Sequence, residues 1–175
     1  MKILALDLAR NTGFALGDLR DRAPTFGSIR FGSVGASHQA LFAAALTWGS
    51  TNFRIWRPDQ IVTEAPMQMR LRGGASRSGN DEIAHGLQAI MMAVAYLLEI
   101  YGFRKAETRD VRMHFLGESP KRAIAKRKTI ERCRMLKWNV TDDNQADACA
   151  IWSYACGLQN TQAALRPTLL FGQGA

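Results

Sequence analysis

The chain has 175 residues, of which 47% are hydrophobic, so it is long enough and apolar enough for one ordinary domain with a single sizeable core. Its formal net charge of +8 indicates a polyanionic partner, such as nucleic acid or an anionic membrane surface. The odd count of three cysteines, without a CxxC pair, argues against both a disulfide framework and a zinc knuckle.

Nothing in the sequence indicates a membrane protein. The longest apolar stretch, at 89–98, is too short to cross a bilayer. Asp7 interrupts the apolar run at the amino terminus too early for a signal peptide. We therefore expect a soluble, cytoplasmic protein, associated with the nucleoid and without a membrane partner.

The first third of the chain predicts an antiparallel meander followed by a helix. Apolar runs at 2–8 and about 12–18 are joined by the turn sequence ARNTG, and residues 25–33 alternate apolar and polar side chains like a third strand. Between Ser37 and Trp56 the apolar residues have helical spacing, and Pro58 marks the stop.

The rest of the chain predicts alternating strands and helices. In order, they are a strand in DQIVTEAP at 59–66, a Gly/Ser/Arg-rich loop at 67–80, an apolar helix at about 81–101, a short fifth strand at 105–108, helices at about 109–116 and 119–136, and a last helix from about 143. This order predicts an α/β fold with a mixed five-stranded sheet and helices on its faces. In such sheets active sites tend to lie at the carboxyl ends of strands.

Four acidic residues stand at places where a carboxylate needs a partner. Asp7 and Glu64 end two apolar strands, and Asp143 and Asp147 are four residues apart on the last helix, so they share one helical face. An unpaired buried charge costs several kcal/mol even after relaxation. Converging carboxylates without a His/Cys cluster suit magnesium or manganese. Two such ions about 4 Å apart would support phosphodiester hydrolysis.

Each acid also has an ordinary structural explanation. Asp7 alone could be a turn or cap residue, and Glu64 could be a satisfied carboxylate at a strand end. Asp142 is a natural N-cap for the last helix, a role that Asp143 could share. Asp147 is hardest to explain in this way, because it lies between two alanines on an otherwise apolar helix.

The combination of motifs resembles the RuvC Holliday-junction resolvases of the ribonuclease H-like superfamily, and in particular their shorter phage and prophage members. The matching segments are LALDLARNTGFAL at 4–16, DQIVTEAP at 59–66, AKRKTIERCRMLKW at 125–138 and DDNQADACAIW at 142–152. The resemblance covers the chain from residue 2 to about 157. It divides the chain into a nuclease domain at 1–157 and a tail of the same domain at 158–175.

The resemblance implies a ribonuclease H-like fold, a homodimer and paired nicks in four-way DNA junctions, with two Mg²⁺ ions per active site that Mn²⁺ may replace. Asp7, Glu64 and Asp147 match the first, second and last catalytic acids of the family. Many members have an acid or histidine where this chain has Asn144. We expect Asp143 to be the fourth ligand instead, and Asn144 or Asp142 remains an alternative.

Residues 121–137 contain eight Lys and Arg side chains against one acid, so most of the net charge lies there. On a helix, Lys121, Lys128 and Arg132 share one side, with Ile124, Ile130 and Met135 helping to form the other. We expect this segment to bind DNA phosphates, although a solvated charged face is the ordinary alternative. The predicted DNA-binding set is Lys121, Lys126, Arg127, Lys128 and Arg132, with Met67, Arg70, Arg72 and Arg77 from the loop.

The resemblance also assigns roles within this set. A basic residue of the helix reaches the scissile phosphate, and Lys128 is our candidate, with Lys126 as the alternative. Met67 matches an apolar side chain that enters the junction, or it is ordinary packing. Two other functions stay open: a nuclease of the same superfamily acting on RNA/DNA hybrid or other branched nucleic acid, and a noncatalytic nucleic-acid-binding protein.

Overall fold

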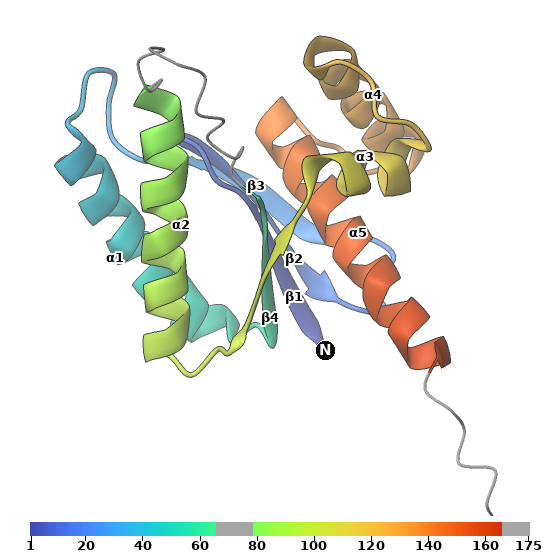
Figure 1. Ribbon diagram of the computed structural model, residues 1–175, viewed down its shortest axis with the longest axis horizontal. Coiled ribbons are helices and arrows are strands. Elements are labelled where there is room, and N and C mark those ends of the chain that lie inside the picture. The colour runs from blue at the N-terminus through green and yellow to red at the C-terminus, as the bar shows by residue number, and fades with distance from the viewer. Residues whose placement is uncertain (66–78, 166–175) are drawn as a thin grey trace, which may run out of the picture.

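The computed structural model describes residues 1–65 and 79–165 as a five-stranded sheet with five helices (Figure 1). The strands are β1 (Lys2–Asp7), β2 (Asn11–Asp18), β3 (Thr25–Arg30), β4 (Gln60–Glu64) and β5 (Gly102–Ala106), and the helices are α1 (His38–Trp56), α2 (Gly79–Leu97), α3 (Thr108–Leu116), α4 (Arg122–Met135) and α5 (Asp143–Leu165). β5 begins three residues before the predicted fifth strand. α5 continues through the boundary that we expected at 157–158.

The sheet is mixed, in the order β3-β2-β1-β4-β5. β1, β2 and β3 form the antiparallel meander, while β4 pairs in parallel with both β1 and β5. Leu6 of β1 is opposite Thr63 of β4. Parallel neighbours end at the same edge of a sheet, so Asp7 and Glu64 come to adjacent positions there.

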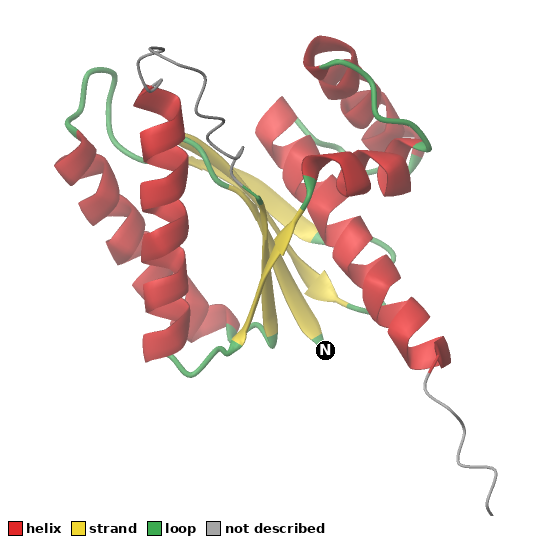
Figure 2. Cartoon of the chain, viewed as in Figure 1, coloured by secondary structure: helices red, strands yellow, loops and turns green. Residues whose placement is uncertain are grey.

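Helices cover both faces of the sheet, as the sequence predicts. Figure 2 shows α1 and α2 on one side and α3, α4 and α5 on the other. Because strand side chains alternate between faces, β1 contributes to two separate cores: Leu4 and Leu6 pack on the side of α1 and α2, and Ile3 and Ala5 on the side of α5. No helix within 1–65 and 79–165 is long and apolar enough to span a membrane.

The buried face of α4 consists of small side chains. Of the apolar residues on the side opposite the basic ones, Ile130 packs against the core, whereas Ile124 and Met135 are 43% and 75% exposed. The helix instead buries Ala125, Thr129 and Cys133. These smaller side chains share one face at four-residue spacing, and α4 packs on α3 and α5.

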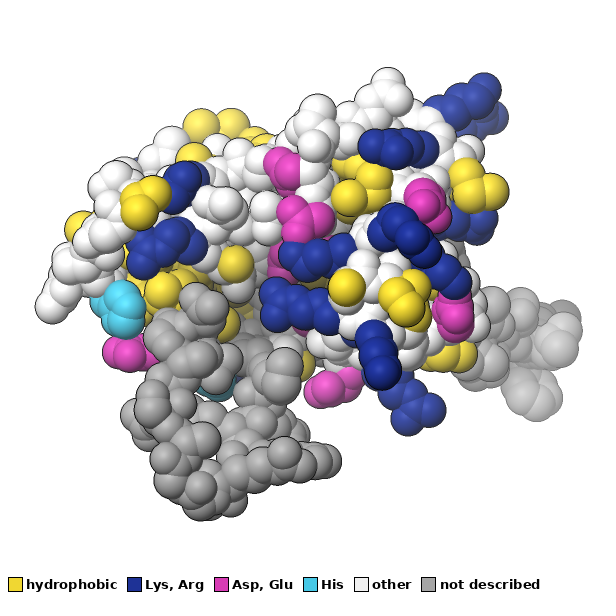
Figure 3. Space-filling model, turned by 90° about the horizontal axis from the view of Figure 1, so that it is seen from above, with side chains coloured by type: hydrophobic (Ala, Val, Ile, Leu, Met, Phe, Trp, Pro, Cys, Tyr) yellow, Lys and Arg dark blue, Asp and Glu magenta, His cyan; other side chains and the backbone are white. Residues whose placement is uncertain are grey.

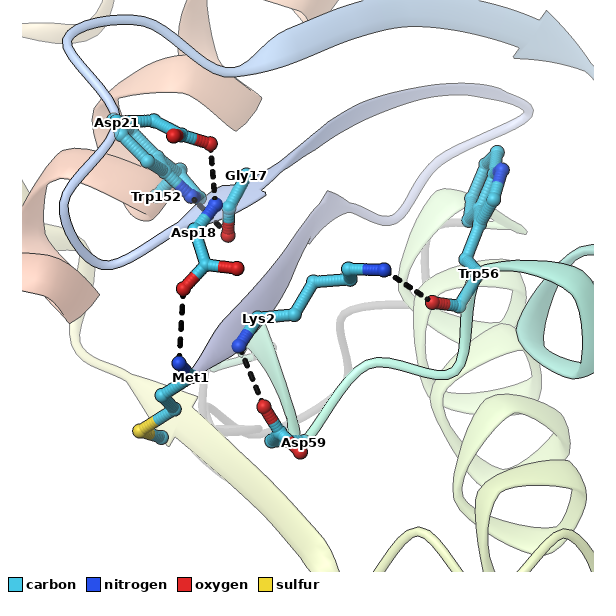
Figure 4. Close-up of polar contacts among 8 residues, drawn as sticks. All are labelled: Met1, Lys2, Gly17, Asp18, Asp21, Trp56, Asp59 and Trp152. Carbon is cyan, nitrogen blue, oxygen red and sulfur yellow. Dashed lines mark hydrogen bonds and ion pairs between the residues drawn. The ribbon is translucent and has the colours of Figure 1, made fainter.

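The starting end of β1 is held by polar contacts between distant segments (Figure 4). The Lys2 amide donates to Asp59 Oδ2 at 2.6 Å, and Lys2 Nζ donates to the carbonyl oxygen of Trp56 at 3.1 Å. On the other side, Trp152 Nε1 of α5 donates to the carbonyl oxygen of Gly17 at 3.4 Å. These contacts tie the start of β1 to the end of α1 and the segment before β4, and tie β2, the neighbour of β1, to α5.

Gly13 allows the first turn of α5 to approach the sheet. It is paired with Asp7 in the sheet register, and a Cβ added to it would lie 1.9 Å from the carbonyl oxygen of Asn144. Side chains at this position are therefore excluded by backbone, which cannot move aside without shifting α5. The glycine thus brings the acids of α5 next to those of β1 and β4.

Gly13→Ala is expected to destabilise the protein by about 2–4 kcal/mol, within the range for strong overpacking and backbone displacement. Urea unfolding followed by circular dichroism measures this change. Gly49→Ala in α1 is the matched control, because its Cβ would meet the flexible Met91 side chain at 3.2 Å and alanine favours the helix. Equal stabilities of the two variants would contradict the proposed close approach at Gly13.

Candidate active site

Three of the four predicted acids face one cavity at the carboxyl ends of β1 and β4. The cavity has a volume of about 500 Å³, and Asp7, Glu64 and Asp147 line it together with Asn144. Asp7 ends β1, Glu64 ends β4, and Asp147 lies in the second turn of α5. Residues separated by up to 140 positions in the sequence therefore meet at one site.

Hydrogen bonds hold the two strand ends on which Asp7 and Glu64 lie. After β1, the buried Thr12 side chain donates to the carbonyl oxygen of Ala9 at 2.7 Å and accepts from the Ala9 amide at 3.2 Å, which closes the turn that follows Asp7. Next to Glu64, Thr63 Oγ1 accepts from Gln88 Nε2 of α2 at 2.9 Å. Both acids are thus placed by ordered backbone.

Asp142 caps α5, the role that its position in the sequence favours. Its Oδ1 accepts from the Gln145 amide at 2.8 Å, while Gln145 Oε1 accepts from the Thr141 amide at 3.0 Å, so the two side chains form a reciprocal cap. Asp142 Oδ2 also accepts from Ser28 Oγ of β3 at 2.7 Å. The cap therefore fixes the start of α5 against the sheet.

The acids in the cavity repel one another. Burial raises the pKa of Asp7 well above its ordinary value, and the charges of Asp147 and Glu64 raise it further. Burial, and then the charge of Glu64, raise the pKa of Asp147 to about 6. Such clusters of acids with raised pKa are typical of functional sites. A bound cation would relieve this repulsion.

Lys126, and not Lys128, is the α4 lysine at the site. Lys126 lines the cavity and forms an ion pair with Asp143. Lys128 is paired with Glu118, away from the cavity. The two side chains leave the helix in directions about 200° apart, so only Lys126, the alternative candidate for the scissile phosphate, lies at the cavity.

Asp143 lies next to the cavity but its carboxylate is engaged by Lys126. The hydrogen bond from Lys126 lowers the pKa of Asp143 below its ordinary value. Asn144, the next residue, does line the cavity. The fourth ligand position thus has two candidates: a carboxylate that must leave its lysine, and a neutral amide oxygen already at the cavity.

Four arginines that sequence reasoning missed also line the cavity: Arg10, Arg30, Arg112 and Arg122. A signal for Arg122 was present, because it lies four residues before Lys126 on the same face of α4. Figure 3 shows Lys and Arg side chains near acidic side chains on the face that carries α4 and the start of α5. The cavity thus contains both acidic and basic side chains.

Three other predicted DNA-binding residues lie outside the cavity lining. Lys121, Arg127 and Arg132 are exposed on or beside α4 but do not line the cavity. Arg127 Nε is 3.7 Å from Glu131 Oε1, one helical turn away. Met67, Arg70, Arg72 and Arg77 lie outside the described residues.

The oxygen donors of the cavity suit Mg²⁺, but among the described residues they are not arranged as a preformed metal-coordination site. The candidate ligands are carboxylate and amide oxygens, which hard cations prefer. Within 1–65 and 79–165, however, no three His, Cys, Asp or Glu side chains are arranged so that together they could hold one metal ion. The main indication of a cation site is thus the convergence of Asp7, Glu64 and Asp147 on one cavity.

Comparison with solved structures identifies the fold. Thermus thermophilus RuvC superposes with a TM-score of 0.69 at 13% sequence identity, over 92% of this chain and 97% of that chain. The chain has a RuvC-like fold. The resemblance to RuvC resolvases and the ribonuclease H-like α/β fold are therefore confirmed at the level of the fold.

Two further structures support this RuvC-like fold. T. thermophilus RuvC in complex with a Holliday junction substrate matches with a TM-score of 0.65 at 12% identity, over 91% of this chain and 96% of that chain. The yeast mitochondrial Holliday junction resolvase Ydc2 matches with a TM-score of 0.64 at 14% identity, over 94% and 81%. No family model and no curated protein matches the sequence.

Proposed function

We propose that this protein is a magnesium-dependent endonuclease that nicks four-way DNA junctions by two-metal phosphodiester hydrolysis. The observation that carries the proposal is the meeting of Asp7, Glu64 and Asp147 at one cavity, at the carboxyl ends of two parallel strands of a RuvC-like fold. T. thermophilus RuvC has been solved with a Holliday junction substrate, which supports this choice of DNA.

The side chains of the cavity divide into two roles. Asp7, Glu64 and Asp147, with Asn144 or Asp143, would hold Mg²⁺. When bound, Mg²⁺ supplies stabilisation of the negative charge that develops on the phosphoryl oxygens. Lys126 lies beside these acids, so its ammonium would offset charge on the same phosphate once it leaves Asp143.

We further propose that the active unit is a homodimer, because a four-way junction offers two equivalent strands. The outer face of α2 supports this, since Met92, Tyr96 and Leu97 are 43%, 71% and 77% exposed. Exposed apolar groups of this kind mark interaction surfaces. Sedimentation equilibrium is expected to give twice the chain mass of 19.4 kDa. A mass equal to that of one chain would contradict the homodimer.

The direct test uses a panel of labelled substrates: a synthetic four-way junction, a flap, a linear duplex of matched sequence and an RNA/DNA hybrid. With Mg²⁺ or Mn²⁺, we expect paired nicks in opposite strands of the junction and at least about tenfold slower cleavage of the others. With EDTA, cleavage is expected to stop while gel-shift binding persists.

Other results would select another function. Faster cleavage of the hybrid would indicate a ribonuclease H-type activity of the same fold. Tight junction binding without cleavage in either metal would indicate a noncatalytic nucleic-acid-binding protein.

A further inference from the structure

Two arginines from the β1–β2 turn and β3 reach the cavity from a different part of the fold than α4. Arg10 lies in the turn after β1, and Arg30 is the last residue of β3; both line the cavity with Asp7 and Glu64. They are close to each other, because Arg30 is opposite Asn11 in the sheet register and the Phe31 amide donates to the carbonyl oxygen of Arg10 at 2.9 Å.

These two side chains keep hydrogen-bonding capacity for a ligand. Within 1–65 and 79–165, neither guanidinium forms an ion pair with a carboxylate. Arg10 Nη1 donates to the carbonyl oxygen of Ser33 at 3.3 Å, which uses one of its five N–H donors and orients the group. Arg30 is exposed. A planar guanidinium with free donors is suited to phosphate oxygens.

A second basic group approaches the acids from the helices. Arg112 of α3, together with Arg122 and Lys126 of α4, lines the same cavity. Arg112 Nη1 is held at 3.3 Å from the carbonyl oxygen of Pro120. Arg10 and Arg30 come from the β1–β2 turn and β3, whereas Arg112, Arg122 and Lys126 come from the helices on the α5 side of the sheet. A nucleic-acid strand with one phosphate at the acids must place its next phosphates on either side of them.

We propose that Arg10 and Arg30 form a phosphate-binding site for the cleaved strand, on the other side of the scissile phosphate from the site formed by Arg112 and Arg122. This inference rests on the proposed function and adds the course of the strand across the active site. The two arginine pairs bind phosphates that flank the scissile one in opposite directions along the strand.

The first test is the salt dependence of junction binding, measured by fluorescence anisotropy in EDTA so that no cleavage occurs. The logarithm of the association constant falls linearly with the logarithm of the salt concentration. Loss of one phosphate contact makes this slope shallower by about 0.9, which corresponds to about fivefold weaker binding at ~0.15 M salt. Arg10→Gln and Arg30→Gln are each expected to show this loss, and the double variant about a 30-fold loss. Arg54→Gln is the control, because Arg54 is exposed in the last turn of α1 and does not line the cavity.

The second test locates the phosphates. In a set of junctions, one phosphate at a time is replaced by an uncharged methylphosphonate. The affinity of each junction is measured for the wild type, for Arg10→Gln/Arg30→Gln and for Arg112→Gln/Arg122→Gln. Where a variant lacks the side chain that contacts the neutralised phosphate, the losses of binding free energy from the variant and from the methylphosphonate should not add. The two double variants are expected to show this non-additivity at phosphates on opposite sides of the scissile position.

The outcomes separate this inference from the proposed function. If the wild type nicks junctions but Arg10→Gln/Arg30→Gln binds them with the affinity and salt slope of Arg54→Gln, the inference is overturned and the nuclease proposal stands. Non-additivity of both variants with the same phosphates also overturns it. If the wild type cuts nothing while the expected slopes and couplings appear, the strand site stands and the nuclease proposal fails. Circular dichroism melting verifies that each variant is folded.

Discussion

Replacing Asp7 by asparagine is expected to reduce cleavage of four-way junctions at least about 1,000-fold, which exceeds the usual effect of losing one transition-state hydrogen-bond donor. Asp7 lines the cavity with Glu64 and Asp147, and burial together with the charges of these two acids raises its pKa. Asparagine keeps the size of the side chain but removes the charge that would hold Mg²⁺. Single-turnover cleavage assays in Mg²⁺ measure the loss.

The affinity of Asp7→Asn for junction DNA is not expected to fall with its cleavage rate. Removing a carboxylate beside the DNA reduces its repulsion of the phosphates, so the Kd of Asp7→Asn for a junction in EDTA is expected to be equal to or lower than that of the wild type. Glu131→Gln is the matched control, because it neutralises an exposed acid of α4 outside the cavity and should leave cleavage unchanged. Cleavage of junctions by Asp7→Asn at the wild-type rate would contradict the proposed mechanism.

Asp147→Asn is expected to stabilise the metal-free protein at pH 8 by about 2–3 kcal/mol, or roughly 5–10 °C in Tm. The pKa of Asp147 rises from 3.8 to about 6 in the folded protein. A carboxyl group whose pKa is raised on folding binds its proton more tightly in the folded state, so its ionisation destabilises that state. The destabilisation by ionised Asp147 is absent below about pH 4, grows between pH 4 and 6, and is fully present above pH 6.

The measurement is a set of thermal or urea unfolding curves of both proteins in EDTA from pH 4 to pH 8. The stabilities of wild type and Asp147→Asn should coincide near pH 4, diverge between pH 4 and 6, and differ by a constant amount above pH 6. Saturating Mg²⁺ at pH 8 is expected to raise the Tm of the wild type and to leave that of the variant nearly unchanged, because only the wild type retains all three acids. A pH-independent difference in stability would contradict the repulsion described for this cluster.

Most of the architecture was predictable from local patterns in the sequence. Apolar runs and turn residues located the strands, and helical spacing between Ser37 and Trp56 located α1, with Ser37 Oγ accepting from the Ala40 amide as its N-cap. The order of the elements predicted a mixed sheet with helices on both faces. These features depend on neighbours in the chain, so the sequence displays them directly.

The acids were predictable for a related reason. A carboxylate at the end of an apolar strand, such as Asp7 or Glu64, conflicts with its surroundings unless something else in the fold compensates it, and such a conflict is visible without a structure. The same logic identified Asp147 between two alanines. The cap role of Asp142 was visible in the same way, because capping depends only on the adjacent turn.

The strands and helices, and the acids that need a partner, follow from the chemistry of adjacent residues and can be read along the chain. The surroundings of those acids depend on how distant segments pack. The tertiary structure placed Lys126 rather than Lys128 at the cavity, used Gly13 to admit α5, and brought Arg10 and Arg30 to the same site. These results depend on how α4 is rotated and how closely α5 approaches the sheet, and both are set by packing between segments far apart in the chain.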